Sequence, residues 1–219
     1  MLAFKRQDGS SEPIYKLARL AHRLKTASAF AGSPLPALWF LTDEARAGDP
    51  IVAARALPPG TGMVLRHYGA PNRAELAVAL AAIAHERGLF LLVGADPSLA
   101  RAVRAHGVHL PRRELAHQVR PSIGGWRTLS AHSRRELEDA LRWRPDAVFL
   151  SPVFATESHP SAAALGPSRF AALARDCPVP VIGLGGLAAP TAPRLLGSGA
   201  MGIAAVGAFL QTTDGALKT

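Results

Sequence analysis

Residues 90–110 read FLLVGADPSLARAVRAHGVHL, and this stretch decides the fold. It begins with the apolar run 90–93 and ends with a second short run at 107–110. The segment between them, 98–105, is rich in alanine, leucine and arginine, which favour a helix. Continuous apolar runs of this length are typical of strands that are buried on both faces. The stretch therefore predicts a unit of two parallel strands joined by a helix.

The same unit repeats outward in both directions. Further apolar runs occupy 38–41, 63–65, 126–129, 147–150, 181–184 and 202–206. Helical segments are expected at 73–87, 133–143 and 168–175. Eight strands, each followed by a helix, in a chain of 219 residues predict an α/β fold with a single (β/α)₈ TIM barrel. A doubly wound sheet is the alternative, but no G-x-G-x-x-G follows the first run.

The composition narrows the class of protein. Hydrophobic residues make up 48% of the chain and charged residues 19%, so a sizeable core can form. No apolar run approaches the roughly 20 residues of a membrane span, and the first residues lack the apolar core of a signal peptide. The single cysteine, Cys177, excludes an internal disulfide. We therefore expect a cytoplasmic protein with no membrane partner.

The net charge of +9 favours an anionic partner, although heavy arginine usage in a GC-rich genome explains it equally well. No lysine lies between Lys25 and Lys218, which excludes a Schiff-base or P-loop lysine from this part of the chain. Arginine can still hold a phosphate through two hydrogen bonds. A phosphorylated small molecule is therefore the favoured class of ligand.

Residues 1–36 differ from the barrel segment 37–219 and form a basic N-terminal helical extension. Ile14, Leu17, Leu20 and Leu24 recur at helical spacing, with basic residues on the opposite side. We expect this helix to pack on the barrel exterior or at a subunit contact of a homo-oligomer. Nucleic-acid binding through the helix is an alternative, but no basic patch with interleaved aromatic residues supports it. We therefore expect no nucleic-acid partner.

In a (β/α)₈ barrel, the chemistry takes place where the strands end. The histidines His67, His109, His132 and His159 fall at these ends, which favours proton transfer or ligand binding. His109 fits a hydrogen-bonded structural histidine equally well. A metal site that combines such histidines with acidic residues is an alternative, but the spacing fits no standard signature.

Two glycine-containing turns predict a phosphate site. Gly185 and Gly186 follow the seventh run, and Val206 and Gly207 end the eighth. Backbone N–H groups after these two strands often bind phosphate in barrels, and glycine lets the ligand come close.

A long loop, 151–166, follows the sixth run and carries hydroxyl groups, among them those of Thr156 and Ser158. These hydroxyls are candidates for the same phosphate, and the loop is a candidate lid. The alternative is a plain connector without a function.

Several stretches resemble the thiamine phosphate synthase/TenI family: TLSAHS at 128–133, LSPVFATES at 150–158 and PVIGLGG at 180–186. Residues 38–43 and 107–110 also fit, and the resemblance runs from about residue 38 to 212. It implies a (β/α)₈ barrel that acts in thiamine biosynthesis. Synthase members join a pyrimidine pyrophosphate to a thiazole phosphate with Mg²⁺ and release pyrophosphate and thiamine phosphate. TenI members isomerise the thiazole phosphate or bind thiamine-type ligands.

The resemblance also implies roles for single residues on the pyrophosphate side. Arg66 is the residue that remains of the Q-L-R-x-K element that binds pyrophosphate. The N-D-D element reads Gly94-Ala95-Asp96, so Asp96 is the remaining carboxylate for a metal. Glu114 corresponds to the second metal carboxylate, and His159 replaces the lysine of the T-x-T-K loop.

The positions that match on the thiazole side are Ser130, His132, Thr156, Gly185 and Gly186. His132 matches the histidine that TenI tautomerases use as a general base, with Ser130 and His159 as further catalytic candidates. The site thus keeps its thiazole-phosphate half better than its pyrophosphate half. Tautomerase chemistry is therefore at least as well supported as synthase chemistry, and Mg²⁺ is expected only for the latter. The alternative is a catalytically silent barrel that binds thiamine phosphate as a sensor.

Overall fold

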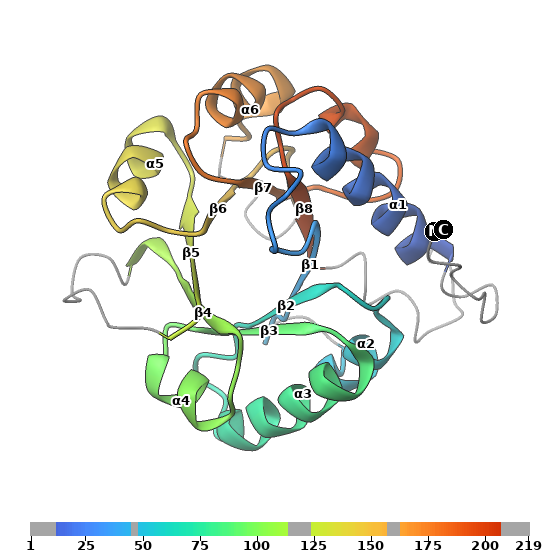
Figure 1. Cartoon of the computed structure of the whole chain (residues 1–219), viewed down its shortest axis with the longest axis vertical. Helices are drawn as coiled ribbons and strands as arrows, with labels where there is room; N and C mark the ends of the chain where they lie inside the picture. The colour runs from blue at the N-terminus through green and yellow to red at the C-terminus, as the bar shows by residue number, and fades with distance from the viewer. Residues whose placement is uncertain (1–11, 45–47, 114–123, 157–162, 207–219) are drawn as a thin grey trace.

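Eight parallel strands close into a barrel in the computed structural model, which describes residues 12–44, 48–113, 124–156 and 163–206 (Figure 1). The strands are β1 (Leu38–Leu41), β2 (Gly62–Leu65), β3 (Phe90–Gly94), β4 (Gly107–Leu110), β5 (Trp126–Ala131), β6 (Ala147–Leu150), β7 (Val181–Leu184) and β8 (Gly202–Ala205). Each strand pairs with the next one along the chain, and β8 pairs with β1. The predicted TIM barrel is confirmed, and the doubly wound alternative is excluded.

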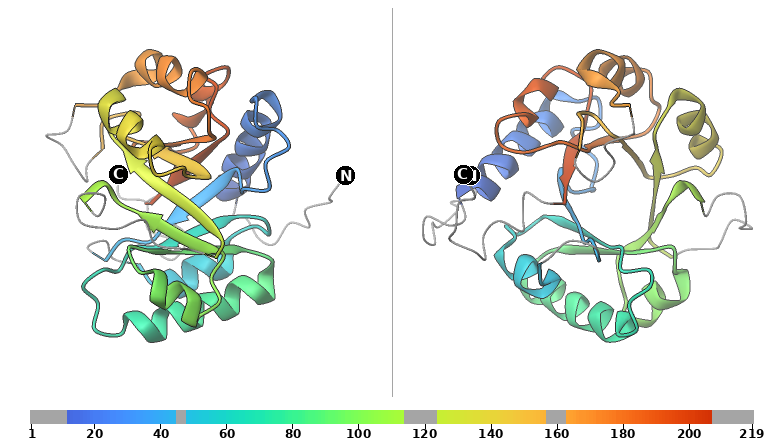
Figure 2. Two further views of the ribbon diagram at one scale, coloured as in Figure 1. Left: turned by 60° about the vertical axis from the view of Figure 1, so that its left-hand side comes forward. Right: turned by 180° about the vertical axis from the view of Figure 1, so that it is seen from behind.

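Helices cover the outside of the barrel as a ring, which the side and rear views show (Figure 2). They are α1 (Glu12–Ala27), α2 (Pro50–Ala56), α3 (Arg73–Arg87), α4 (Pro97–Ala102), α5 (Arg134–Leu141), α6 (Gly166–Arg175) and the 3₁₀ helix η3 (Ala192–Leu195). The connection from β7 to β8 holds only this 3₁₀ turn in place of the expected helix. Gly197 and Gly199, both with positive φ, follow the turn and end it.

Successive residues of each strand belong to two separate parts of the core. Trp39, Val64, Leu92 and Phe149 pack with one another, whereas alternate strand residues pack against the helices. Trp39 and Phe149 meet edge to face with their ring centroids 5.4 Å apart. Gly62 makes room for the indole, because a Cβ there would lie 2.2 Å from Trp39 Cε3.

Helix α1 lies on the barrel exterior, where it contacts β1, β8 and η3 (Figure 1). Its buried residues are Ile14, Leu17, Leu20, Ala21 and Leu24, the set that recurs at helical spacing in the sequence. The prediction of an exterior contact for this helix is confirmed. Among the residues that the structure describes, no helix is long and apolar enough to cross a membrane.

Candidate functional site

The side chains predicted to act together gather at one end of the barrel, beyond the carboxyl ends of the strands. The described candidates there are Arg66 after β2, Asp96 after β3, Ser130 in β5, His132 after β5, Thr156 after β6, Gly185 and Gly186 after β7, and Val206 after β8. The remaining candidates Glu114, Ser158, His159 and Gly207 lie outside the described residues.

His132 is held at the rim of the barrel by Ser151, the first residue after the neighbouring strand β6. Its Nδ1 lies 3.0 Å from the carbonyl oxygen of Ser151 and 3.1 Å from the Ser151 hydroxyl. A carbonyl oxygen only accepts hydrogen bonds, so Nδ1 carries the proton and donates it. In the neutral ring, Nε2 is then the basic nitrogen. The side chain is exposed, so a ligand in the mouth can reach it.

The backbone of His132 is also fixed, by the start of α5. Its N–H donates to Glu136 Oε2 at 2.9 Å. Ser133, the N-cap residue of α5, accepts from the N–H of Glu136 at 3.2 Å. Both bonds tie the end of β5 to the first turn of α5, much as a capping box does. His132 therefore sits on a rigid strand-to-helix junction.

His109 forms a polar layer inside the barrel, beneath the mouth. Its Nδ1 lies 2.9 Å from the Thr128 hydroxyl and its Nε2 lies 2.9 Å from the Ser130 hydroxyl. Complete burial, with a smaller contribution from the charge of Arg66, lowers the pKa of His109 to about 3. The ring is therefore neutral at physiological pH and serves as a hydrogen-bonded structural group. It fixes the hydroxyl of Ser130, which the pairing of Ser130 with Phe149 places within β5 rather than after it.

Gly185 and Gly186 let the segment after β6 lie directly on the turn after β7. Their φ angles are +96° and +65°, and a Cβ on Gly185 would lie 2.8 Å from Pro152 Cα. A Cβ on Gly186 would lie 2.7 Å from Phe154 Cβ. Thr156 comes next to Gly185, since its Cγ2 would be 3.3 Å from that added Cβ. Three of the predicted phosphate contacts are thus brought together.

Arg66 is anchored to the end of β1. Its Nε donates to the carbonyl oxygen of Thr42 at 2.8 Å, and its Nη2 lies 3.3 Å from Asp43 Oδ2. The Thr42 hydroxyl accepts from the N–H of Arg66 and lies 2.9 Å from His67 Nδ1. Burial lowers the pKa of His67, while the nearby carboxylates Glu44 and Asp43 oppose this shift. His67 is therefore a neutral group at physiological pH.

Asp96 is paired with a backbone N–H group and with an arginine side chain. Its Oδ1 accepts from the N–H of Leu99 at 2.9 Å as the N-cap of α4, and its Oδ2 lies 3.5 Å from Arg73 Nη1. Within the described ranges, no group of three or more His, Cys, Asp or Glu side chains could hold a metal ion. A guanidinium beside the carboxylate repels a divalent cation. Asp96 is therefore paired with Arg73 among the described residues, while Glu114, the second expected carboxylate, lies outside them.

The sequence did not single out Arg73 or Tyr68 as site residues, and it included Ser151 only as the first residue of the loop 151–166. Arg73 is the first residue of a long amphipathic helix, so nothing in its spacing separates it from a solvated arginine. Tyr68 lies in the loop before that helix, at the lysine position of the Q-L-R-x-K element, where an uncharged side chain did not suggest a ligand contact. Ser151 had a usable signal, because it continues the inward alternation of Ala147 and Phe149.

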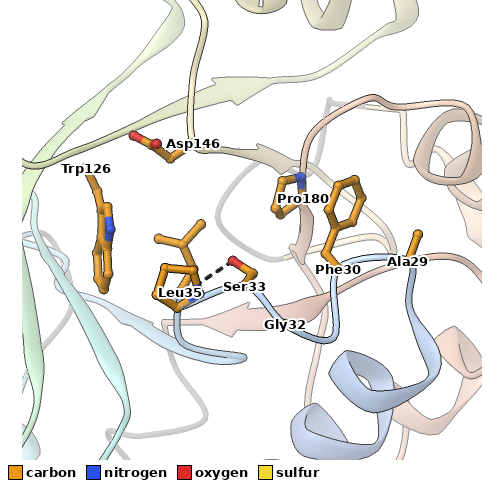
Figure 3. Close-up of a pocket in the computed structure, with 9 residues that line it drawn as sticks. Ala29, Phe30, Gly32, Ser33, Leu35, Trp126, Asp146 and Pro180 are labelled. Atoms are coloured by element: carbon orange, nitrogen blue, oxygen red, sulfur yellow. Dashed lines mark hydrogen bonds between the residues drawn. The ribbon is translucent and has the colours of Figure 1, made fainter.

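Two cavities lie at the opposite end of the barrel, where the strands begin. One, of about 380 Å³, is lined by the loop 29–35 and by Trp126, Asp146 and Pro180. Figure 3 shows Phe30 and Trp126 on either side of Leu35 in this cavity. The other, of about 630 Å³, lies between the ends of α3 and α4, next to Phe90 and His106. Neither cavity includes a residue that the sequence predicted to be functional.

Comparison with known proteins identifies the family of the chain. The family model described as thiamine monophosphate synthase matches residues 38–209. A putative thiamine-phosphate synthase 2 from Aquifex aeolicus is 32% identical over 187 residues, covering 81% of this chain and 99% of that protein. A putative thiamine-phosphate synthase from Geobacter sulfurreducens is 32% identical over 190 residues, covering 81% and 88% of the two chains.

A comparison with solved structures shows that the fold is shared. The solved structure of a thiamine phosphate pyrophosphorylase from Pyrococcus furiosus superimposes with a TM-score of 0.67 at 24% identity. The alignment covers 83% of this chain and 90% of that one. The family match spans all eight strands and every described candidate at the mouth. The chain therefore belongs to the thiamine monophosphate synthase family.

Proposed function

We propose that this protein isomerises a thiazole phosphate by proton transfer, with His132 as the general base. The observation that carries the proposal is the pair of contacts from His132 Nδ1 to the Ser151 carbonyl and hydroxyl oxygens, at 3.0 and 3.1 Å. They direct the basic Nε2 away from β6, on a side chain that remains exposed at the mouth. A fixed tautomer is what a base needs to accept a proton repeatedly from the same direction.

The phosphate of the substrate would bind at the turn after β7. Gly185 and Gly186 present backbone there without side chains, and Thr156 lies alongside with its hydroxyl. Val206 directly follows the neighbouring strand, β8, at the same rim. This anchor is coupled to the base, because Pro152, which contacts Gly185, directly follows the residue that holds His132. The phosphate anchor and the base are therefore adjacent.

Beyond the base and the phosphate site, the proposed reaction requires only the transfer of protons. Nε2 of His132 takes a proton from one atom of the thiazole, and a proton returns to another atom, so no group leaves and no oxidation occurs. While the ring is protonated, the bond from Nδ1–H to the Ser151 carbonyl becomes charge-assisted and stronger. Ser130, whose hydroxyl is fixed by His109, is placed to orient the substrate from inside the barrel.

The synthase reaction is the second candidate, favoured by the names of the related proteins. It would require the protein to take up the charge of a leaving pyrophosphate. Arg66 is present for this, but it is paired with Asp43, and Asp96 is paired with Arg73. Proton transfer needs neither of these groups.

A solvent-exchange experiment tests the proposal. The protein is incubated with thiazole phosphate in D₂O containing EDTA, and deuterium incorporation is followed by NMR. We expect enzyme-dependent incorporation that falls about 100-fold or more in His132→Gln. His85→Gln, which changes an exposed histidine on the far end of α3, is the matched control and should retain full activity.

Three further outcomes would contradict the proposal. Binding of thiazole phosphate without deuterium incorporation would indicate that the protein is a sensor rather than an enzyme. Formation of thiamine phosphate from both precursors, without deuterium exchange into thiazole phosphate, would indicate that the protein is a synthase. Equal activity in the His132 and His85 variants would exclude His132 as the base.

A further inference from the structure

We propose that the outer face of α3 pairs with the same face of a second copy of this chain, so that two antiparallel helices form a symmetric dimer contact. The face consists of Glu75, Val78, Ala82 and His85, which we call the α3 seam. Helix α3 lies on the outside of the barrel between α2 and α4, and all four residues of the seam are exposed (Figure 1). The proposal concerns this surface alone and does not depend on the chemistry at the mouth.

The outer face of α3 is apolar at its centre, unlike that of α1. Helix α1 exposes the charged residues Lys16, Arg19 and Arg23, as is usual for a helix packed on a barrel. Helix α3 instead exposes Val78 and Ala82, and Val78 is 60% exposed. The opposite face of α3 is buried against the barrel. A helix with apolar residues on both faces is normally covered on both, so the seam fits a contact with another surface.

The spacing of the seam is typical of paired helices. Its four residues follow one another at intervals of three, four and three, as the a and d positions of a heptad do. A two-fold axis level with Leu80 places Val78 opposite the partner's Ala82. The same axis places Glu75 opposite the partner's His85. The apolar pair is therefore central and the polar pairs lie at the two ends.

The charges at the ends of the seam favour a second copy, in antiparallel orientation, as the partner. Glu75 lies in the first turn of α3 and His85 in the last. Antiparallel helices bring each Glu75 beside an imidazole, which can donate a hydrogen bond to a carboxylate, whereas parallel helices would bring two glutamates together. Glu86 flanks this end, but its carboxylate lies 3.5 Å from Arg55 Nη1 of the same chain. The seam is thus complementary to itself.

The shape of the surface agrees with this pairing. The cavity of about 630 Å³ borders α3 at Ala81 and Ala82, and residues 103–106 line its other side. The two-fold axis brings the partner's Val78 to Ala82, at the edge of this cavity. A valine that packs into a hole beside an alanine is the knobs-into-holes contact of paired helices. Because of the symmetry, this contact forms twice in one dimer.

Sedimentation equilibrium of the full chain, from about 1 to 200 μM, tests the proposal. We expect reversible association from 23.0 kDa to twice this mass, with a dissociation constant on the order of 10 μM, because two helices bury less than a standard interface. Val78→Glu should raise this constant about 20-fold or more, since it buries an unpaired charge at two places in the dimer. Glutamate is a better helix former than valine, so α3 should stay folded, which circular dichroism verifies.

Leu196→Glu is the matched control for Val78→Glu. It adds the same charge at another exposed apolar residue, which is 41% exposed and lies in the connection between β7 and β8. This variant should dimerise as the unmodified protein does.

A charge exchange tests the polar ends of the seam. His85→Glu should weaken the dimer about fivefold, because each Glu75 then faces a carboxylate of the partner. The double variant Glu75→Lys/His85→Glu should restore dimerisation, since it exchanges the two groups and keeps them complementary.

Disulfide formation tests the register directly. Val78→Cys and Ala82→Cys proteins are mixed and oxidised, and we expect a disulfide between the two variants in preference to one between identical copies. The native Cys177 is buried and should not compete.

The proposal would be overturned by a chain that stays monomeric throughout the concentration range, which would leave the apolar face to a different protein. Equal effects of Val78→Glu and Leu196→Glu, no restoration by the charge exchange, or disulfides mainly between two copies of Val78→Cys would also contradict it. Proton transfer should be the same in monomer and dimer, and in His85→Gln, because the seam lies outside the barrel and away from the mouth. Failure of one proposal therefore leaves the other standing.

Discussion

The buried His109 predicts a specific loss of stability in mild acid. Its pKa is lowered from an ordinary value of 6.5 to about 3, chiefly by burial. The folded pKa lies below the unfolded one, so the neutral ring stabilises the fold fully above pH 6.5. That stability is lost as the pH falls towards 3, because His109 binds a proton in the unfolded chain at pH values at which it stays neutral in the folded chain.

The size of the stability loss follows from the pH range between the folded and the unfolded pKa of His109. Each pH unit below the unfolded pKa costs about 1.4 kcal/mol, so moving from pH 7 to pH 5 should cost about 2 kcal/mol through this residue alone. No reduction for solvent screening applies, because the ring is 1% exposed. Both its nitrogens are already bonded to hydroxyls, Thr128 and Ser130, which can adapt to a neutral ring but offer no negative charge.

Urea denaturation at pH 7, 6 and 5 measures this effect in the unmodified protein and in His109→Gln. The variant is expected to be less stable at pH 7, but its loss of stability between pH 7 and 5 should be smaller by about 2 kcal/mol. Other histidines, including His67 and His106, whose pKa values burial also lowers, contribute equally to both proteins and cancel in the difference. An identical pH dependence in the two proteins would refute the reasoning.

Two further predictions follow from the packing. Gly186→Ala should destabilise the protein by about 2–4 kcal/mol in urea denaturation, since it adds a clash with Phe154 to the strain of a positive φ. Gly60→Ala, with a similar φ of +79° but open space around it, should cost only about 1 kcal/mol, and equal losses would contradict the clash. Cys177 is buried and burial raises the pKa of its thiol, so labelling by iodoacetamide at pH 8 should be slow in the folded protein and fast in urea. Fast labelling without urea would show that the thiol is accessible.

The strands and the buried face of α1 were predictable from the sequence because burial requires apolar residues at regular positions along the chain. Runs such as 147–150 must be apolar throughout, since one set of side chains meets the barrel interior and the other meets the helices. The positions of Arg66 and His132 at the mouth follow from the same logic, because each comes directly after a strand. The 3₁₀ turn after β7 was not predictable with this certainty, as the segment is short and its composition allows a helix.

Contacts between side chains at the mouth produce no such pattern in the sequence, because they join residues that are far apart along the chain. The ion pair of Asp96 with Arg73 was not predictable, because Arg73 comes from α3, a different part of the chain. The contact between His132 and Ser151 likewise joins two loops that only the closed barrel brings together. Whether His109 is a site residue or a structural one was open in the sequence, and it depends on Thr128 and Ser130, which lie on the next strand.

The most direct test of the central claim is deuterium incorporation into thiazole phosphate in the presence of EDTA, measured for the unmodified protein and for His132→Gln. The account predicts incorporation by the first and a loss of about 100-fold or more in the second, with thiazole phosphate still bound. No incorporation by the unmodified protein, or incorporation that His132→Gln leaves unchanged, would contradict it.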